Sequence, residues 1–154
     1  MRLSFTLLLA AACATARPHY GQIAFKSGAN AASRPAAYSV DKGRLWSSDF
    51  DARVDGDCIR GVMGSIPLQF CREDKPGPVE RWVGASGDFT VQNLGNSIAV
   101  DGYMTVRPGR QVYMTQTIPL GEGPQWEELK RNPALLAVAA TAADLKAVGG
   151  SAGF

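Results

Sequence analysis

Apolar and polar side chains alternate along residues 50–70, which is the pattern of β-strands that bury one face. The dipeptides Asp55-Gly56 and Gly64-Ser65 interrupt this alternation, and both are of the kind that closes a two-residue hairpin. The stretch therefore predicts three antiparallel strands joined by two tight turns. One face is expected to be apolar throughout, with Phe50, Ala52, Val54, Ile59, Met63, Ile66, Leu68 and Phe70.

The two turns also set which residues face one another. Around the first turn we expect Asp51 opposite Arg60, as an ion pair on the polar face. Around the second we expect Cys58 opposite Cys71, where the strands are not hydrogen-bonded and side chains lie closest. Pro67 falls on the same kind of position, so it would lose no ladder hydrogen bond.

A second group of strands is expected around residues 81–83, 88–92, 97–106 and 111–118. Pro108-Gly109 fits a type II turn, which would place Met104 opposite Tyr113. Asp101-Gly102 fits either a turn or a bulge inside one long strand, and the sequence leaves both open.

The apolar period changes from two to that of a helix after residue 122. Gly123-Pro124 is expected to open a short helix, and Asn132-Pro133 an N-cap and first turn of a second one that Gly149-Gly150 stops. The second helix should bury one apolar stripe, made of Leu135, Leu136, Val138, Ala139, Ala142, Leu145 and Val148. The order of elements predicts an α+β fold, a mostly antiparallel β meander or half-open barrel with a C-terminal helix packed on it.

The chain opens with a basic start, Met1-Arg2, and a mostly apolar run of ten residues, 3–12. The run is too short to span a bilayer, which needs about 20 residues. Small residues follow at once, and this order predicts an export signal over residues 1–16. In one interpretation the signal is cut after Ala16, so that the mature chain begins at Arg17.

In the other interpretation, residues 9–13 (Leu-Ala-Ala-Ala-Cys) resemble a bacterial lipoprotein signal. The resemblance implies that Cys13 is lipidated, becomes the new N-terminus and anchors the protein to a membrane. The pattern departs from these signals at Ala10, where a large aliphatic residue is usual. Both interpretations leave Cys58 and Cys71 as an even pair. In an oxidising compartment we expect them to form a structural disulfide that contributes about 2–3 kcal/mol.

Residues 17–44 are rich in Ala, Ser, Gly, Arg and Pro and predict a flexible tether before a single β-rich domain at 45–150. Residues 14–44 carry a net charge of +4 and residues 45–154 one of −3. The whole chain, at 154 residues with 45% apolar residues and a net charge of +2, has enough material for one hydrophobic core. Its charge gives no argument for a nucleic-acid partner.

No catalytic residues, cofactor site or metal site are predicted. His19, the single histidine, lies in the predicted tether, which argues against histidine-dependent catalysis and zinc binding. Asp49, Asp51, Asp55 and Asp57 form an acidic stretch that suits a hairpin and its solvated face better than catalysis or calcium. The aromatic residues are expected in core or rim packing rather than in a ligand patch; they include Trp46, Trp82, Trp126, Tyr103 and Tyr113.

The sequence thus favours an exported bacterial envelope protein on the periplasmic side of a membrane, acting as a non-enzymatic binding or structural module. Its partner would be the membrane, through Cys13, together with a protein or an envelope ligand. Two other functions stay open. One is an inhibitor or accessory protein of a hydrolase, which would use a protruding loop such as residues 73–78. The other is an enzyme that uses the aspartates.

Overall fold

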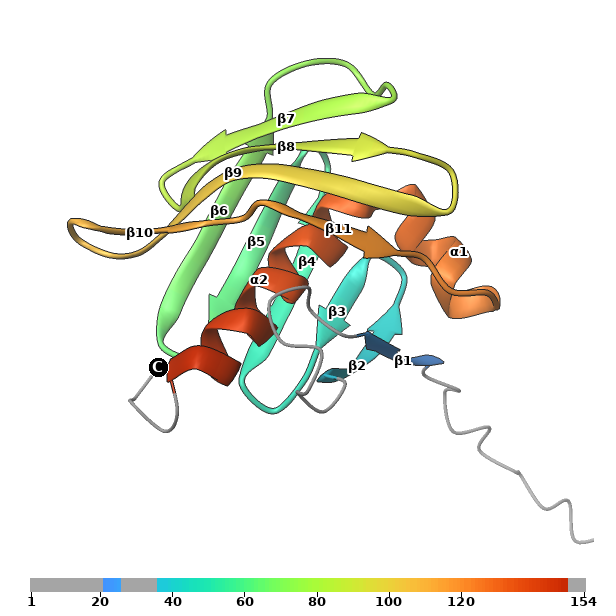
Figure 1. The fold of residues 1–154 in the computed structure, drawn as a ribbon, viewed down its shortest axis with the longest axis horizontal. Helices are drawn as coiled ribbons and strands as arrows, with labels where there is room; N and C mark the ends of the chain where they lie inside the picture. Colours follow the sequence, from blue (N-terminus) through green and yellow to red (C-terminus); the bar gives the residue numbers. More distant parts are fainter. Residues whose placement is uncertain (1–20, 26–35, 150–154) are drawn as a thin grey trace, which may run out of the picture.

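The computed structural model describes residues 21–25 and 36–149, which form one β-sheet and two helices (Figure 1). The strands are β1 (Gly21–Phe25), β2 (Ala36–Asp41), β3 (Arg44–Trp46), β4 (Phe50–Asp55), β5 (Cys58–Met63), β6 (Ile66–Arg72), β7 (Val79–Gly84), β8 (Gly87–Asn93), β9 (Ser97–Arg107), β10 (Arg110–Tyr113) and β11 (Gln116–Pro119). The helices are α1 (Pro124–Arg131) and α2 (Pro133–Gly149).

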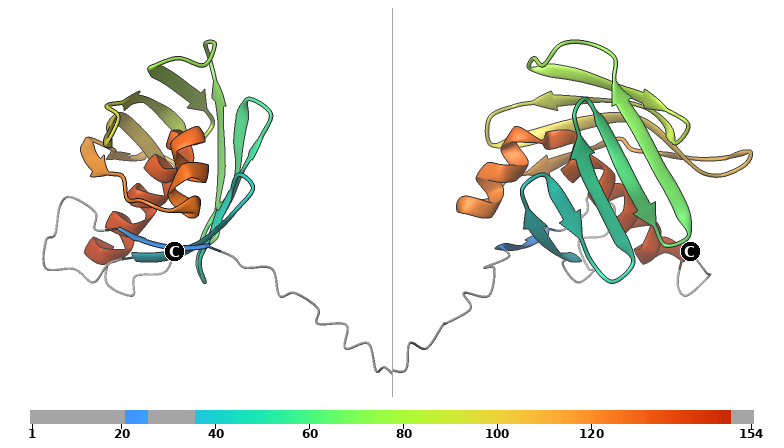
Figure 2. Two further views of the ribbon diagram at one scale, coloured as in Figure 1. Left: turned by 90° about the vertical axis from the view of Figure 1, so that its right-hand side faces the viewer. Right: turned by 180° about the vertical axis from the view of Figure 1, so that it is seen from behind.

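The strands pair in chain order, which makes the sheet an antiparallel meander. Among the described residues, β1 to β10 are successive neighbours, and β11 pairs with β9 beyond the end of β10. Strands β6 and β7 share only two residue pairs, Cys71 with Val83 and Arg72 with Trp82. The sheet turns a corner there, and its two halves form a half-barrel around α2 (Figures 1 and 2). The predicted half-open barrel with a C-terminal helix is confirmed.

Helix α2 is buried on all its sides from Ala134 to Ala142, and residues 143–145 are partly buried. Every residue from Ala134 to Ala140 is at most 1% exposed. The helix packs against β3 and β4 in one half of the sheet and against β8 and β9 in the other. The predicted apolar stripe is buried from Leu135 to Ala142, and Leu145 packs partly against the core. The residues between them are buried too, because a helix enclosed by two sheet halves must be apolar all round. The side chain of Val148 lies outside the described residues. The many alanines of the helix let the strands approach it closely.

Buried hydroxyl groups around α2 find partners on the helix backbone. The hydroxyl of Tyr38, on β2, donates to the carbonyl oxygen of Ala139 at 3.0 Å. The hydroxyl of Thr141 donates to the carbonyl oxygen of Ala137, also at 3.0 Å. Burial raises the pKa of Tyr38 well above its usual value, so the phenol stays protonated and keeps its role as a donor.

The junction between the helices is closed by Asn132. Helices α1 and α2 begin at Pro124 and Pro133, as predicted. The side-chain amide of Asn132, however, donates backwards to the carbonyl oxygen of Glu128 at 3.4 Å, and its backbone N–H donates to Leu129 at 3.0 Å. The side chain of Asn132 thus closes the last turn of α1. Asn132 also directly precedes α2, as predicted, and its carbonyl oxygen accepts a hydrogen bond from the N–H of Leu135 at 3.1 Å.

The register of the second predicted hairpin is confirmed, with Cys58 opposite Cys71. The register of the first is wrong, because Asp55 faces Cys58 and the turn is formed by Gly56 and Asp57. Gly56 takes a φ of 61°, whereas Asp57 does not take a positive φ. The chain uses a turn with glycine in the first central position, which spares Asp55 a strained conformation. Each residue of β4 faces a residue of β5 two positions beyond the predicted one. Because side chains alternate with a period of two, the same residues still form the apolar face.

Strand β9 runs unbroken through Asp101 and Gly102, so this dipeptide is not a turn. Gly102 lies opposite Phe89 of β8 and has a φ of 149°. A side chain at Gly102 would collide with the backbone of Phe89. Glycine is therefore what allows β9 to stay long while it curves against β8.

The turn at Pro108-Gly109 forms where it is predicted. Between Arg110 and Gln111 the register of β10 on β9 shifts by a bulge. Tyr113 consequently faces Tyr103 rather than the predicted Met104. One extra residue in one strand is enough to displace every later pair.

The sheet begins earlier than the predicted domain boundary. Strands β1, β2 and the start of β3 fall inside residues 17–44, which the sequence predicts as a tether. Tyr38 and Val40 of β2 are buried in the core. The tether prediction is wrong for these strands, because an alternation this short does not show as a sustained apolar period. The predicted export signal, residues 1–16, lies outside the described residues.

Ser86 ties the two sheet halves together where β6 and β7 stop pairing. It lies in the turn between β7 and β8 and is buried. Its hydroxyl accepts a hydrogen bond from the backbone N–H of Gln69 at 2.7 Å and donates one to the carbonyl oxygen of Pro67 at 3.2 Å. One side chain thus satisfies backbone groups of β6 that have no partner strand at this point.

We expect Ser86→Ala to lower the free energy of unfolding by about 1–3 kcal/mol, because it leaves the N–H of Gln69 without its partner. Urea unfolding followed by circular dichroism measures the change. Ser65→Ala, at the exposed tip of the β5–β6 hairpin, is the matched control and should change stability by less than about 0.5 kcal/mol. Equal losses in both variants would contradict the role given to Ser86.

Candidate functional site

The outer face of β3, β4 and β5 carries a row of arginines. Arg44 faces Arg53, and Arg53 faces Arg60. Their strand neighbours Leu45 and Ala52 are buried, so the arginines lie on the opposite, solvent-facing side of the sheet. Neighbouring strands are only about 4.8 Å apart, and like charges directly opposite each other destabilise a sheet. Folding alone does not favour such a row.

The arginine row lines a groove with a volume of about 450 Å³. Asp51, Gly61 and Val62 complete its lining. Three guanidinium groups and one carboxylate give this lining a net formal charge of +2. Val62 is 45% exposed, so an apolar surface lies beside the charged one. The groove can therefore receive an anionic group that is attached to a less polar body.

Arg44 is fixed in place on one side of the groove. Its Nε and Nη2 donate to the two carboxylate oxygens of Asp51 at 2.9 and 2.6 Å. Its guanidinium carbon lies 4.7 Å from the centre of the Trp46 ring. The hydrogen bonding from Arg44 lowers the pKa of Asp51, so the pair stays ionised. The predicted Asp51/Arg60 pair is wrong, since the register places Asp51 opposite Val62.

Arg53 and Arg60 are much less engaged than Arg44. Within the described part of the chain, no ion pair involves Arg53. Arg60 has one partner, Asp55, at 3.9 Å, and both side chains are more than half exposed. An exposed pair at that distance contributes little energy and is easily exchanged. Two neighbouring guanidinium groups are therefore available to a ligand.

The four aspartates of the predicted acidic stretch each have a partner of their own. Each contacts a different residue: Asp49 contacts Ser47, Asp51 contacts Arg44, Asp55 contacts Arg60 and Asp57 contacts Arg72. Among the residues that the structure describes, no group of three acidic, histidine or cysteine side chains is placed to hold a metal ion.

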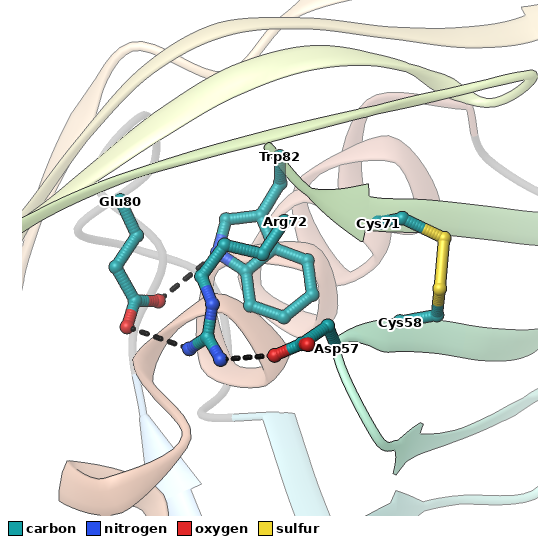
Figure 3. A network of polar contacts seen from close by, with 6 residues as sticks. All are labelled: Asp57, Cys58, Cys71, Arg72, Glu80 and Trp82. Atoms are coloured by element: carbon teal, nitrogen blue, oxygen red, sulfur yellow. Dashed lines mark hydrogen bonds and ion pairs between the residues drawn. A yellow bond between two sulfur atoms is a disulfide. The ribbon is translucent and has the colours of Figure 1, made fainter. Parts of the chain in front are cut away.

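A second polar network lies inside the corner between β6 and β7 (Figure 3). Glu80 is only 8% exposed, and its carboxylate accepts hydrogen bonds from Trp82 Nε1 at 3.0 Å and Arg72 Nη1 at 3.2 Å. The other end of the Arg72 guanidinium pairs with Asp57 in the β4–β5 turn. Arg72 also lies against the Trp82 ring, 5.6 Å from its centre. This network joins β5, β6 and β7.

The disulfide reinforces the same corner. Cys58 and Cys71 are bonded, as predicted, and lie one residue along their strands from Asp57 and Arg72 (Figure 3). Both carboxylate oxygens of Glu80 and both terminal nitrogens of Arg72 are used within the network, whereas the buried Nε of Arg72 has no partner among the described residues. We therefore assign the network a structural role at the corner of the sheet.

The aromatic side chains do not form one patch. Trp82 and Trp126 are buried in the core, whereas Tyr113 on β10 is 79% exposed. Trp46 is partly buried and stacks with Arg44. Core or rim packing, the expected role, is confirmed for Trp82 and Trp126.

The residues on which the predicted membrane anchor depends lie outside the described part of the chain. This holds for Cys13 and for His19. Neither described helix combines the length and the apolar character that crossing a membrane requires.

We expect Glu80→Ala to destabilise the protein by about 3–5 kcal/mol, because it leaves the largely buried charge of Arg72 with only Asp57 as a partner. Glu73→Ala is the matched control: Glu73 also pairs with an arginine, Arg81, at 2.9 Å, but both side chains are about half exposed. It should cost less than about 1 kcal/mol. Urea unfolding compares the two, and a loss no larger for Glu80 than for Glu73 would contradict a buried network.

Comparisons of this chain with protein-family models, with curated proteins and with solved structures found no match.

Proposed function

We propose that this protein is an exported, non-enzymatic module of the bacterial cell envelope that binds an anionic ligand in the groove of β3, β4 and β5. The proposed binding role rests on the row of Arg44, Arg53 and Arg60. Their positive charges repel one another across adjacent strands, and only Arg44 is tightly paired with a carboxylate. Side chains whose arrangement lowers the stability of the fold are candidates for a binding role.

Two features of the chain support the envelope location. The N-terminal pattern of a basic start, a short apolar run and small residues is that of an export signal. The disulfide between Cys58 and Cys71 requires an oxidising compartment, which the bacterial periplasm provides. Lipidation of Cys13 would hold the domain at a membrane, and cleavage after Ala16 would release it.

A second candidate function is inhibition of a hydrolase. The loop between β6 and β7, residues 73–78, is exposed at every position. It projects beyond the sheet at the top of Figure 1 and leaves the corner that the disulfide and the Arg72 network hold. A loop on so rigid a support is suited to insertion into a partner.

The envelope location is tested by mass spectrometry of the mature N-terminus from a bacterial host. A diacylated or triacylated Cys13 is expected if the chain is a lipoprotein, and a free Arg17 if the signal is cleaved after Ala16. Either mature form supports export. An unprocessed Met1 in all of the material would contradict it.

The binding role is tested with a heparin oligosaccharide as a model polyanion, whose affinity is measured at several salt concentrations. For the double variant Arg53→Gln/Arg60→Gln we expect the slope of log affinity against log salt to fall by about 1 per arginine removed. The control Arg110→Gln/Arg131→Gln removes two exposed arginines that lie outside the groove. An equal fall in the control would show that only net charge matters and would overturn the proposal.

A further inference from the structure

We infer that the groove of β3, β4 and β5 is a phosphate site in which Arg53 and Arg60 bind the ligand and Arg44 forms a fixed wall. The inference rests on the proposed binding role of the same groove and names the chemistry of its ligand.

Arg53 and Arg60 are the guanidinium groups of the groove that can bind a ligand. Arg44 already donates through both Nε and Nη2 to Asp51 and is stacked on Trp46. Arg53 has no ion pair among the described residues, and the 3.9 Å contact of Arg60 with Asp55 is loose and exposed. The ligand therefore meets two cations that lie directly opposite each other on adjacent strands.

The positions of Arg53 and Arg60 favour a tetrahedral anion over a planar one. In this groove the planar carboxylate of Asp51 forms a bidentate pair with one guanidinium group, that of Arg44. A tetrahedral oxyanion has oxygens that point in more than one plane, so it can accept from Arg53 and Arg60 at the same time. Phosphate also brings a charge of about −1.5 to −2 at pH 7, which opposes the +2 of the lining better than one carboxylate does.

The organic part of the ligand would occupy the groove beside the phosphate group. The groove, at about 450 Å³, is far larger than a phosphate ion needs. The exposed Val62 adds an apolar surface beside the arginines. These features fit a phosphate ester whose organic part lies over Val62. Its source can be a soluble phosphate ester or the headgroup of an anionic lipid, and the two share the same recognition chemistry.

The experiment is a nuclear magnetic resonance titration of the folded, disulfide-bonded protein at constant ionic strength. The probes are glycerol 2-phosphate, inorganic phosphate and acetate. We expect both phosphates to bind about five-fold more tightly than acetate and to shift the Nε–Hε signals of Arg53 and Arg60. Arg53→Gln and Arg60→Gln should each weaken phosphate binding about five-fold, whereas Arg110→Gln should leave it unchanged.

Vesicles separate the two sources. Phosphatidylcholine vesicles with and without phosphatidic acid are compared by sedimentation, using the wild type and Arg53→Gln. Binding to phosphatidic acid that depends on Arg53 identifies a lipid headgroup as the source. Its absence, together with binding of glycerol 2-phosphate, identifies a soluble ester, and either outcome supports a phosphate site.

The inference and the proposed function fail in different ways. If acetate binds as tightly as phosphate, or if Arg53→Gln does not weaken phosphate binding, the phosphate site is overturned. Salt-dependent binding of heparin through the same arginines would still uphold the anion-binding role. If the groove variants change neither measurement, both are overturned.

Discussion

The enclosure of α2 is the constraint on which the rest of the structure depends. From Ala134 to Ala142 this helix has no solvent-facing side and needs apolar partners in every direction, and two halves of one sheet supply them. The sheet must therefore bend through a corner, and it does so between β6 and β7, where only two residue pairs remain. The inward-facing side chains of both halves pack against the helix, so charged side chains lie on the outer face of the sheet.

The corner is held by three kinds of interaction that do not require strand pairing. The disulfide joins β5 to β6, the network of Arg72 and Glu80 joins β6 to β7, and Ser86 returns the β7–β8 turn to the backbone of β6. Of these, the Ser86 hydroxyl satisfies backbone groups of β6 that a continuous sheet would satisfy by itself. These interactions cross-link the strands next to the corner, and the groove of β3, β4 and β5 lies on the half of the sheet that contains β5 and β6.

Much of the fold could be predicted from local patterns. The second hairpin, the disulfide and the starts of both helices follow from alternation, turn residues and proline positions, which act over a few residues. The arginine row could not be predicted in the same way. It depends on the register between β4 and β5, which a one-residue change in the Gly56 turn displaces, and on β3, which the sequence assigns in part to a tether. Strand β2 could not be predicted from local patterns either, because its residue Tyr38 contacts Ala139 of α2, 101 residues away along the chain.

The separation between Tyr38 and Ala139, 101 residues along the chain, has a consequence for how the protein folds. The helix that fills the half-barrel is the last described element to be synthesised, so every strand waits with its apolar face uncovered until that helix arrives. Contacts between residues so far apart in sequence slow folding and prolong the exposure of sticky intermediates. A protein built in this order benefits from folding only when the whole chain is present, and the proposed export of an unfolded chain would impose that order.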